Sequence, residues 1–181
     1  MIVQSVYLLT LLTMAYGAFE QGVPQESCSG RNQVGRLVQI IPYNNTNETT
    51  WIAKPEKVMR ADFIFESSLS IPKAELTIGA ILDPDGGPGG RPLEVAYGRP
   101  EDACKLLNGT RCEKEAIEKG EIYKLKAIFD VPGGIPKISL KVRFLLRETM
   151  TRKLSRAQKT NWRKHPGNII FCVLLPAVVV D

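Results

Sequence analysis

The residues best suited to chemistry in this chain are four cysteines and one histidine, namely Cys28, Cys104, Cys112, Cys172 and His165. Cys104 and Cys112 are too far apart for a metal knuckle, and a lone histidine cannot complete a usual zinc ligand set. We therefore expect no metal site. An even number of cysteines predicts two disulfides instead if the chain follows a secretory route, and the sequence alone leaves three connectivities open.

No catalytic constellation is visible in the sequence. His165 lies beside a proline in a Lys-rich segment, without an evident carboxylate or serine partner for general acid-base or triad chemistry. Glu101 and Asp102 are explained by a turn before Cys104 rather than by a catalytic carboxylate pair. The glycine-rich segment 83–90 lacks the Lys-Ser or Lys-Thr pair of a P-loop, so nucleotide binding has little support. We predict a protein that is not an enzyme and uses no cofactor.

The beginning of the chain has the composition of a signal peptide. Residues 2–14 form an uncharged apolar run, and Ala15 and Gly17 place small residues where a signal peptidase reads them. A membrane anchor is the alternative, but the run is shorter than the roughly 20 residues of a spanning helix. We predict a signal peptide over 1–17 and one domain over 18–181, secreted to the extracellular space or routed to the lysosomal lumen.

Three Asn-X-Thr triplets fit the same route and predict glycosylation at Asn44, Asn47 and Asn108. The chain carries a formal net charge of +5. A positive charge can indicate nucleic acid binding, but a secretory route makes an anionic lipid, glycan or cell surface the better partner. We therefore expect no nucleic acid partner.

Basic residues crowd one segment near the end of the chain that contains no acidic residue. They are Arg152, Lys153, Arg156, Lys159, Arg163 and Lys164. A long solvated loop is the simplest interpretation, because charge runs usually face water. The alternative is contact with anionic membranes or acidic lipid headgroups, with Trp162 as an interfacial anchor.

The chain that carries these residues has the periodicity of β-strands. Apolar and polar residues alternate over 137–146 and over 121–130, and the turn-rich segment 131–136 joins the two runs as a hairpin loop. Further strands are expected over 35–41, 58–65, 74–82 and 168–180, and one short helix over 113–119. Short strands at this spacing predict an all-β, immunoglobulin-like β-sandwich.

Several segments, taken in order, resemble the ML lipid-recognition family. Segment 28–30 (Cys-Ser-Gly) resembles the family's first Cys-Gly segment, and segment 100–104 its Pro-Asp-x-Cys motif. Two nearby cysteines in 104–112 precede the Lys-Gly turn and tyrosine of 119–123. A late cysteine follows within the apolar run 170–173. The order and spacing of these segments carry the resemblance, which covers essentially the whole mature chain.

The resemblance implies a fold of two antiparallel sheets with an apolar cavity between them. It also implies the disulfides Cys28–Cys172 and Cys104–Cys112. Members such as the sterol-transfer proteins carry a further local pair early in the chain, and this sequence has none there.

Carried over position by position, the resemblance implies a set of lipid-contacting residues. These are Phe63, Phe65, Val95, Tyr97, Val131, Ile135, Pro136 and Phe144. The phenylalanines could equally be ordinary core. Val95, Val131 and Ile135 are expected in loops, where an apolar residue has less structural reason to be, so they are the stronger candidates.

Together these features predict a secreted protein that binds and transfers a sterol, a fatty acid or a similar apolar ligand. Its partners would be that lipid and an anionic membrane surface or a lipid-accepting receptor. The alternative function is an innate-immune module that binds lipopolysaccharide-like acidic lipids, with the basic segment meeting phosphates.

Overall fold

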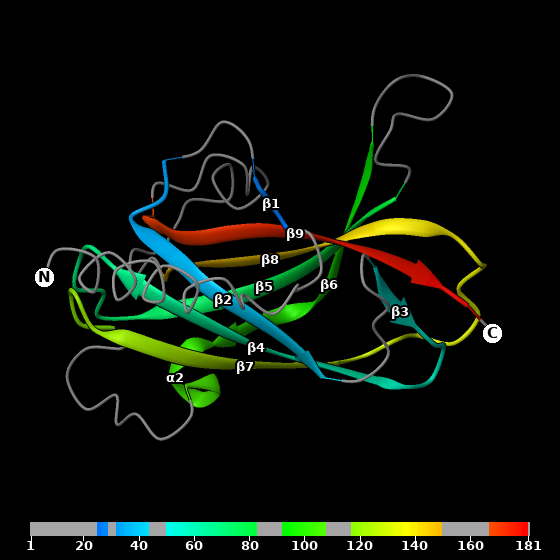
Figure 1. Cartoon of the computed structure of the whole chain (residues 1–181), viewed down its shortest axis with the longest axis horizontal. Helices are drawn as coiled ribbons and strands as arrows, with labels where there is room; N and C mark the ends of the chain where they lie inside the picture. Colours follow the sequence, from blue (N-terminus) through cyan, green and yellow to red (C-terminus); the bar gives the residue numbers. More distant parts are fainter. Residues whose placement is uncertain are drawn as a thin grey trace, which may run out of the picture.

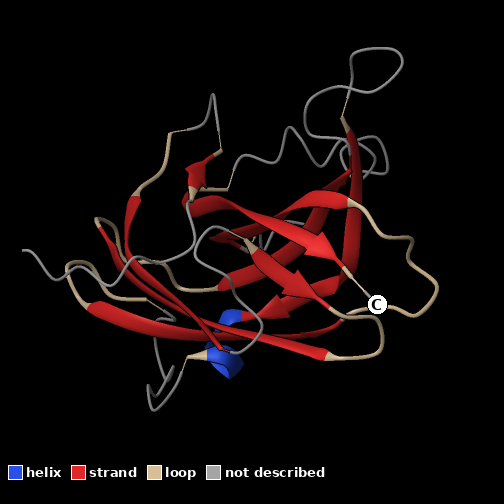
Figure 2. Ribbon diagram, turned by 45° about the vertical axis from the view of Figure 1, so that its right-hand side comes forward, coloured by secondary structure: helices blue, strands red, loops and turns tan. Residues whose placement is uncertain are grey.

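The computed structural model describes residues 25–28, 32–43, 50–82, 92–107, 117–149 and 167–180. These residues form two β-sheets that pack face to face, with the hydrophobic core between them (Figure 1). Figure 2 shows that strands make up nearly all of the regular structure. The predicted all-β sandwich of two antiparallel sheets is therefore confirmed, with one parallel strand pair added to it.

The larger sheet has six strands in the order β1-β9-β8-β5-β6, with β3 paired in parallel to β9. Its strands are β1 (Glu26–Ser27), β3 (Trp51–Ala53), β5 (Ala74–Leu82), β6 (Leu93–Asp102), β8 (Ser139–Glu148) and β9 (Ile169–Val179). The smaller sheet has three strands in the order β2-β4-β7. These are β2 (Gly35–Tyr43), β4 (Val58–Ser67) and β7 (Ile122–Asp130).

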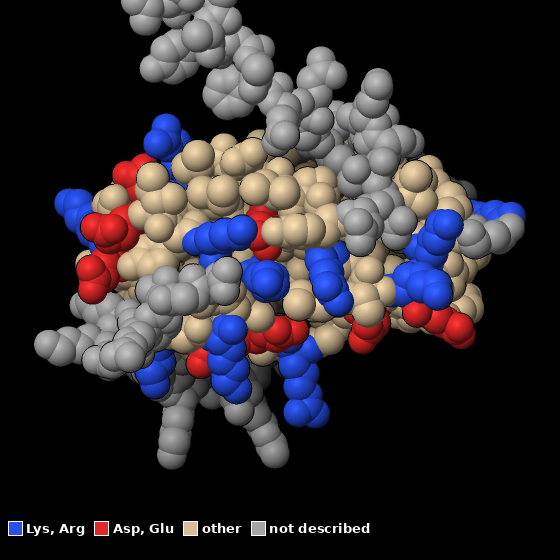
Figure 3. Space-filling view, turned by 60° about the horizontal axis from the view of Figure 1, so that its bottom comes forward, with Lys and Arg blue, Asp and Glu red and all other residues tan. Residues whose placement is uncertain are grey.

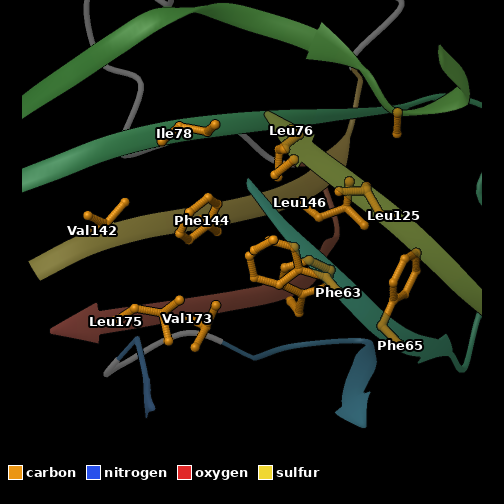
Figure 4. Close-up of a cluster of buried hydrophobic side chains, with 14 of the residues drawn as sticks. Phe63, Phe65, Leu76, Ile78, Leu125, Val142, Phe144, Leu146, Val173 and Leu175 are labelled. Carbon is orange, nitrogen blue, oxygen red and sulfur yellow. The ribbon is translucent and has the colours of Figure 1, made fainter. Parts of the chain in front are cut away.

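The periodicity of the sequence explains which face each strand buries. On β8, Leu140, Val142, Phe144 and Leu146 point into the sandwich and are buried. On β7 the alternation is equally regular, with Lys124 and Lys126 on the outer face. Aromatic rings from both sheets meet in the middle, as Figure 4 shows for part of the cluster.

Two expectations about local structure are wrong. Val95 lies in strand β6 and not in a loop. Gly98 and Pro100 interrupt the strand pattern of this segment, but β6 is an edge strand, where a proline does not remove a ladder hydrogen bond. The described end of the expected helix 113–119 is not helical, because Ile117 forms a β-bridge with Ile71 and is fully buried.

Among the described residues, the helix is α2 (Ala103–Leu106), which Asp102 caps by accepting a hydrogen bond from the amide of Cys104 at 3.0 Å. Asp102 therefore has the structural role expected of it. None of the helices in the described part of the chain is long and apolar enough to span a membrane.

The disulfide Cys28–Cys172 is confirmed, with its Cα atoms 5.4 Å apart. It ties the segment after β1 to the middle of β9. Cys104 is also disulfide-bonded, and its predicted partner, Cys112, lies outside the described residues. The signal peptide, the three glycosylation sites and the six basic residues of 152–164 lie outside them as well.

Candidate functional site

An apolar cavity of about 70 Å³ lies between the two sheets at one end of the sandwich. Ile78 of β5 and Leu140 and Val142 of β8 form its wall on the larger sheet, and Met59 and Phe129 form the opposite wall. The surface that faces the interior of the cavity is entirely apolar. Such a surface favours contact with hydrocarbon over contact with water, because it offers water no hydrogen-bond partner.

The connection between β7 and β8 crosses the mouth of this cavity. One end is fixed where the amide of Val131 donates to the carbonyl of Lys57 at 2.9 Å. The other end is fixed where the amide of Val179 donates to the carbonyl of Ile138 at 2.9 Å. Between these anchors, Gly134 has a φ of 76°, a turn conformation that favours glycine. The loop is therefore held at both ends by backbone hydrogen bonds.

The structure brings three of the eight predicted contact residues together. Tyr97, Val131 and Ile135 line the cavity. Val95 lies opposite the lining residue Ala80 in the strand register, but its side chain is 44% exposed and outside the lining. Pro136 is exposed on the loop and also outside the lining.

The three predicted phenylalanines lie deeper, in the core. Phe63, Phe65 and Phe144 are all 0% exposed. The rings of Phe63 and Phe144 are 4.7 Å apart, and Phe65 packs on Tyr123 at 5.8 Å (Figure 4). These rings close the interior behind the cavity and do not line it. Their contact with a ligand stays a prediction that requires the core to rearrange.

The volume of the cavity sets a condition on any ligand. An apolar cavity of about 150 Å³ accommodates benzene, and pockets for larger molecules occupy roughly 300–1,000 Å³. The cavity described here is smaller than either. A sterol or an acyl chain would therefore require the loop or the lining side chains to move outward.

A second hollow, of about 140 Å³, adjoins the cavity where the edge strands β6 and β7 separate. Tyr97 and Phe129 line both spaces, and their rings meet edge to face at 5.8 Å. The outer hollow is also lined by Arg99, Glu101 and Asp130. The pair of rings thus stands between an apolar interior and a polar exterior.

The Tyr97 hydroxyl fixes the position of its ring between the two spaces by donating a hydrogen bond to the carbonyl of Asp130. Burial raises the pKa of Tyr97, and the nearby charge of Asp130 raises it further. The phenol therefore remains neutral and keeps its donor at physiological pH.

Sequence reasoning missed the contribution of β3 to this region. Ala53 lines the cavity, and Trp51 lies fully buried next to the lining residue Phe129, with ring centroids 5.7 Å apart. The signal was the short apolar run of residues 51–53, which could have been interpreted as a strand. Among the residues that the structure describes, no three His, Cys, Asp or Glu side chains gather where they could hold a metal ion.

A separate polar cluster lies on the outer face of the smaller sheet. The buried carboxylate of Asp62 accepts a hydrogen bond from the Tyr43 hydroxyl at 2.7 Å and pairs with Lys124 at 2.5 Å. The hydrogen bond to Asp62 raises the pKa of Tyr43, and it raises the pKa of Lys124 as well. Figure 3 brings the β7 side forward and shows Lys and Arg side chains spread over it, with acidic side chains among them.

A solved structure with the same fold supports this description. The crystal structure of a Niemann-Pick type C2 protein from Japanese carpenter ant superposes with a TM-score of 0.58 at 20% sequence identity. The match covers 86% of this chain and 98% of that one. The expected resemblance to the ML family is thereby confirmed for the fold. No protein-family model and no curated protein sequence matches the chain.

Proposed function

We propose that this protein binds an apolar lipid between its two sheets and carries it through an aqueous compartment. The observation that carries the proposal is the cavity beneath residues 131–138, which lies between the sheets and exposes only apolar surface to its interior. The likeness in fold to a Niemann-Pick type C2 protein supports the same role. Binding of this kind needs no catalytic group.

The opening that the ligand needs has a physical source in the architecture. β6 and β7 are end strands of their sheets and are not paired with each other, and among the described residues an isolated bridge on this side joins Leu107, after α2, to Leu125 of β7. Displacement of Tyr97 and Phe129 would join the cavity to the outer hollow. This displacement breaks the Tyr97–Asp130 hydrogen bond, whose net contribution to stability is about 1 kcal/mol.

The gain from binding is larger than that cost. Burying about 12 methylene groups at roughly 0.8 kcal/mol each contributes about 10 kcal/mol before the ordering of ligand and protein is subtracted. A sterol, a fatty acid or a related apolar molecule supplies this much buried surface. The ligand class is therefore defined by its hydrocarbon content.

We also place the protein in an oxidising compartment, extracellular or lysosomal. The disulfide Cys28–Cys172 supports this, because such bonds persist there and are rare in the cytosol. Delivery to an anionic membrane or a receptor belongs to the same proposal. Arg60 and Lys126 supply positive charge on β4 and β7, whereas Arg36 and Lys124 are paired with the carboxylates of Glu66 and Asp62. Binding to vesicles rich in phosphatidylserine should weaken steeply with salt, and salt-independent binding would refute this part.

The experiment that tests lipid binding compares two matched substitutions. Ala80→Phe places a ring in the cavity lining, whereas Ala96→Phe places the same ring at an exposed position on β6. A panel of a fluorescent sterol, a fluorescent fatty acid and a phospholipid is titrated into each protein. We expect Ala80→Phe to lose at least tenfold in affinity and Ala96→Phe to bind like the wild type. Equal affinities for all three proteins would place the lipid elsewhere, and no binding by any would refute the function.

The alternative function, recognition of lipopolysaccharide-like acidic lipids, depends on the basic segment 152–164. That segment lies outside the described residues, and the alternative stays a prediction.

A further inference from the structure

The indole nitrogen of Trp51 is a buried hydrogen-bond donor that has no acceptor among the described residues. Trp51 begins β3 and is 0% exposed, and its Nε1 has no hydrogen-bond partner in the part of the chain that the structure describes. Buried tryptophans usually satisfy this donor, because an unpaired buried N–H loses its bond to water without compensation. The side chain therefore requires an explanation beyond packing.

The position of Trp51 places it at the inner end of the apolar cavity. β3 and β9 run in parallel, with Ala53 paired to Val179 and Trp51 paired to Ala177. Ala53 and Val179 line the cavity, and Trp51 lies two residues further along the same face of β3. At a rise of about 3.3 Å per residue, Trp51 therefore lies roughly 7 Å further along the strand, into the sandwich, than Ala53 does.

The surroundings of Trp51 offer little to its N–H group. Its ring neighbours are Phe129, at 5.7 Å and 90°, and Phe144, at 6.0 Å. An aromatic face is a weak acceptor compared with oxygen. Phe129 also lines the cavity, so a ligand that displaces this ring comes next to the indole.

We propose that the lipid bound in this cavity carries an oxygen atom at its inner end, and that this oxygen accepts a hydrogen bond from Nε1 of Trp51. The inference rests on the proposed lipid-binding function and specifies the ligand class. The ligand is an oxygenated lipid that enters with its acceptor leading, rather than one whose polar end remains at the mouth.

The charge of the site further restricts the acceptor. No Lys or Arg of the described residues lines the cavity, whereas Asp130 lies at its edge. An ionised carboxylate at the inner end would be buried without a counter-ion, which is strongly unfavourable. A ketone, ester or alcohol oxygen accepts the same hydrogen bond without that penalty. The structure thus favours a neutral oxygenated lipid.

The test uses two ligands of equal chain length, a long-chain methyl ketone and the corresponding alkane. Trp51→Phe removes the N–H group and keeps an aromatic ring, so affinities are measured for both ligands with both proteins. We expect the variant to lose about five- to tenfold in affinity for the ketone, the equivalent of one net hydrogen bond. Affinity for the alkane should stay the same or increase, because the smaller ring leaves more room.

If Trp51→Phe lost the same factor in affinity for the ketone and for the alkane, or lost affinity for neither, the inference would be overturned while lipid binding remained intact. Failure of the wild type to bind either ligand would instead refute the proposed function.

Should the variant not fold, the indole N–H signal of Trp51 in the ¹⁵N spectrum of the wild type provides the second measurement. The ketone should shift this signal to lower field and the alkane should not; indistinguishable spectra would overturn the proposal. The chain has only two tryptophans, so Trp162→Phe assigns the signal.

Discussion

Replacing Phe144 by alanine tests whether its ring belongs to a tightly packed core or lies in a space kept open for a ligand. The Phe144 ring contacts Phe63 at 4.7 Å, Phe129 at 5.8 Å and Trp51 at 6.0 Å, and the residue is fully buried. A buried Phe→Ala change costs about 3–5 kcal/mol, and aromatic pairs add about 0.5–1.5 kcal/mol each. Three such contacts place the expected loss in the upper part of that range, at about 4–5 kcal/mol.

The loss is measured by urea unfolding, with the slope of the transition checked for constancy, and by thermal melting. For a domain of this size the melting temperature should fall by roughly 8–20 °C. Ile122→Ala is the matched control, because Ile122 is 65% exposed on β7 and should change stability by less than about 0.5 kcal/mol. A loss below about 1.5 kcal/mol for Phe144→Ala would show that the ring is loosely held, and the reasoning would fail.

Three further predictions concern the disulfide, the polar cluster and the entrance. Cys28→Ala with Cys172→Ala opens a cross-link that spans 144 residues; unfolding free energy should drop by about 5 kcal/mol, and a drop below about 1 kcal/mol would contradict the prediction. The folded-state pKa values of Tyr43 and Lys124 are raised, so the stability from their contacts with Asp62 is complete below about pH 10 and is lost as pH rises. Between pH 8 and 11 the free energy of unfolding should fall more steeply for the wild type than for Tyr43→Phe. Parallel curves of unfolding free energy against pH would refute the coupling. Tyr97→Phe removes the hydrogen bond at the entrance, so stopped-flow measurements should show lipid release several times faster, whereas an unchanged rate would mean that this ring does not limit exit.

The fold could be predicted because its main strands follow local rules. The alternation over 137–146 identified β8, and the run over 121–130 identified β7, each with the correct buried face. β6 was missed because its Gly98 and Pro100 are tolerated only at a sheet edge, and edge position is a property of the whole fold. The bridge of Ile117 to Ile71 likewise depends on a contact between distant segments.

The site could be predicted only in part for a related reason. The resemblance to the ML family implied Val131 and Ile135, their apolar character in a turn-rich connection made them stronger candidates, and the structure places both in the cavity lining. Alternation shows that Phe63 and Phe144 face inward, but it cannot show whether an inward side chain meets other side chains or an empty space. Trp51 enters the site through a parallel pairing with β9, across more than a hundred residues of chain.

The measurement that tests the central claim most directly is native mass spectrometry of the protein secreted by a host cell, with organic extraction of whatever co-purifies. We predict one lipid molecule per chain, recovered in the extract and displaced by competing lipid. A protein that is recovered empty and takes up nothing from a mixed panel of sterols, fatty acids and neutral oxygenated lipids would contradict the claim, because the cavity would then be a packing defect of a closed core.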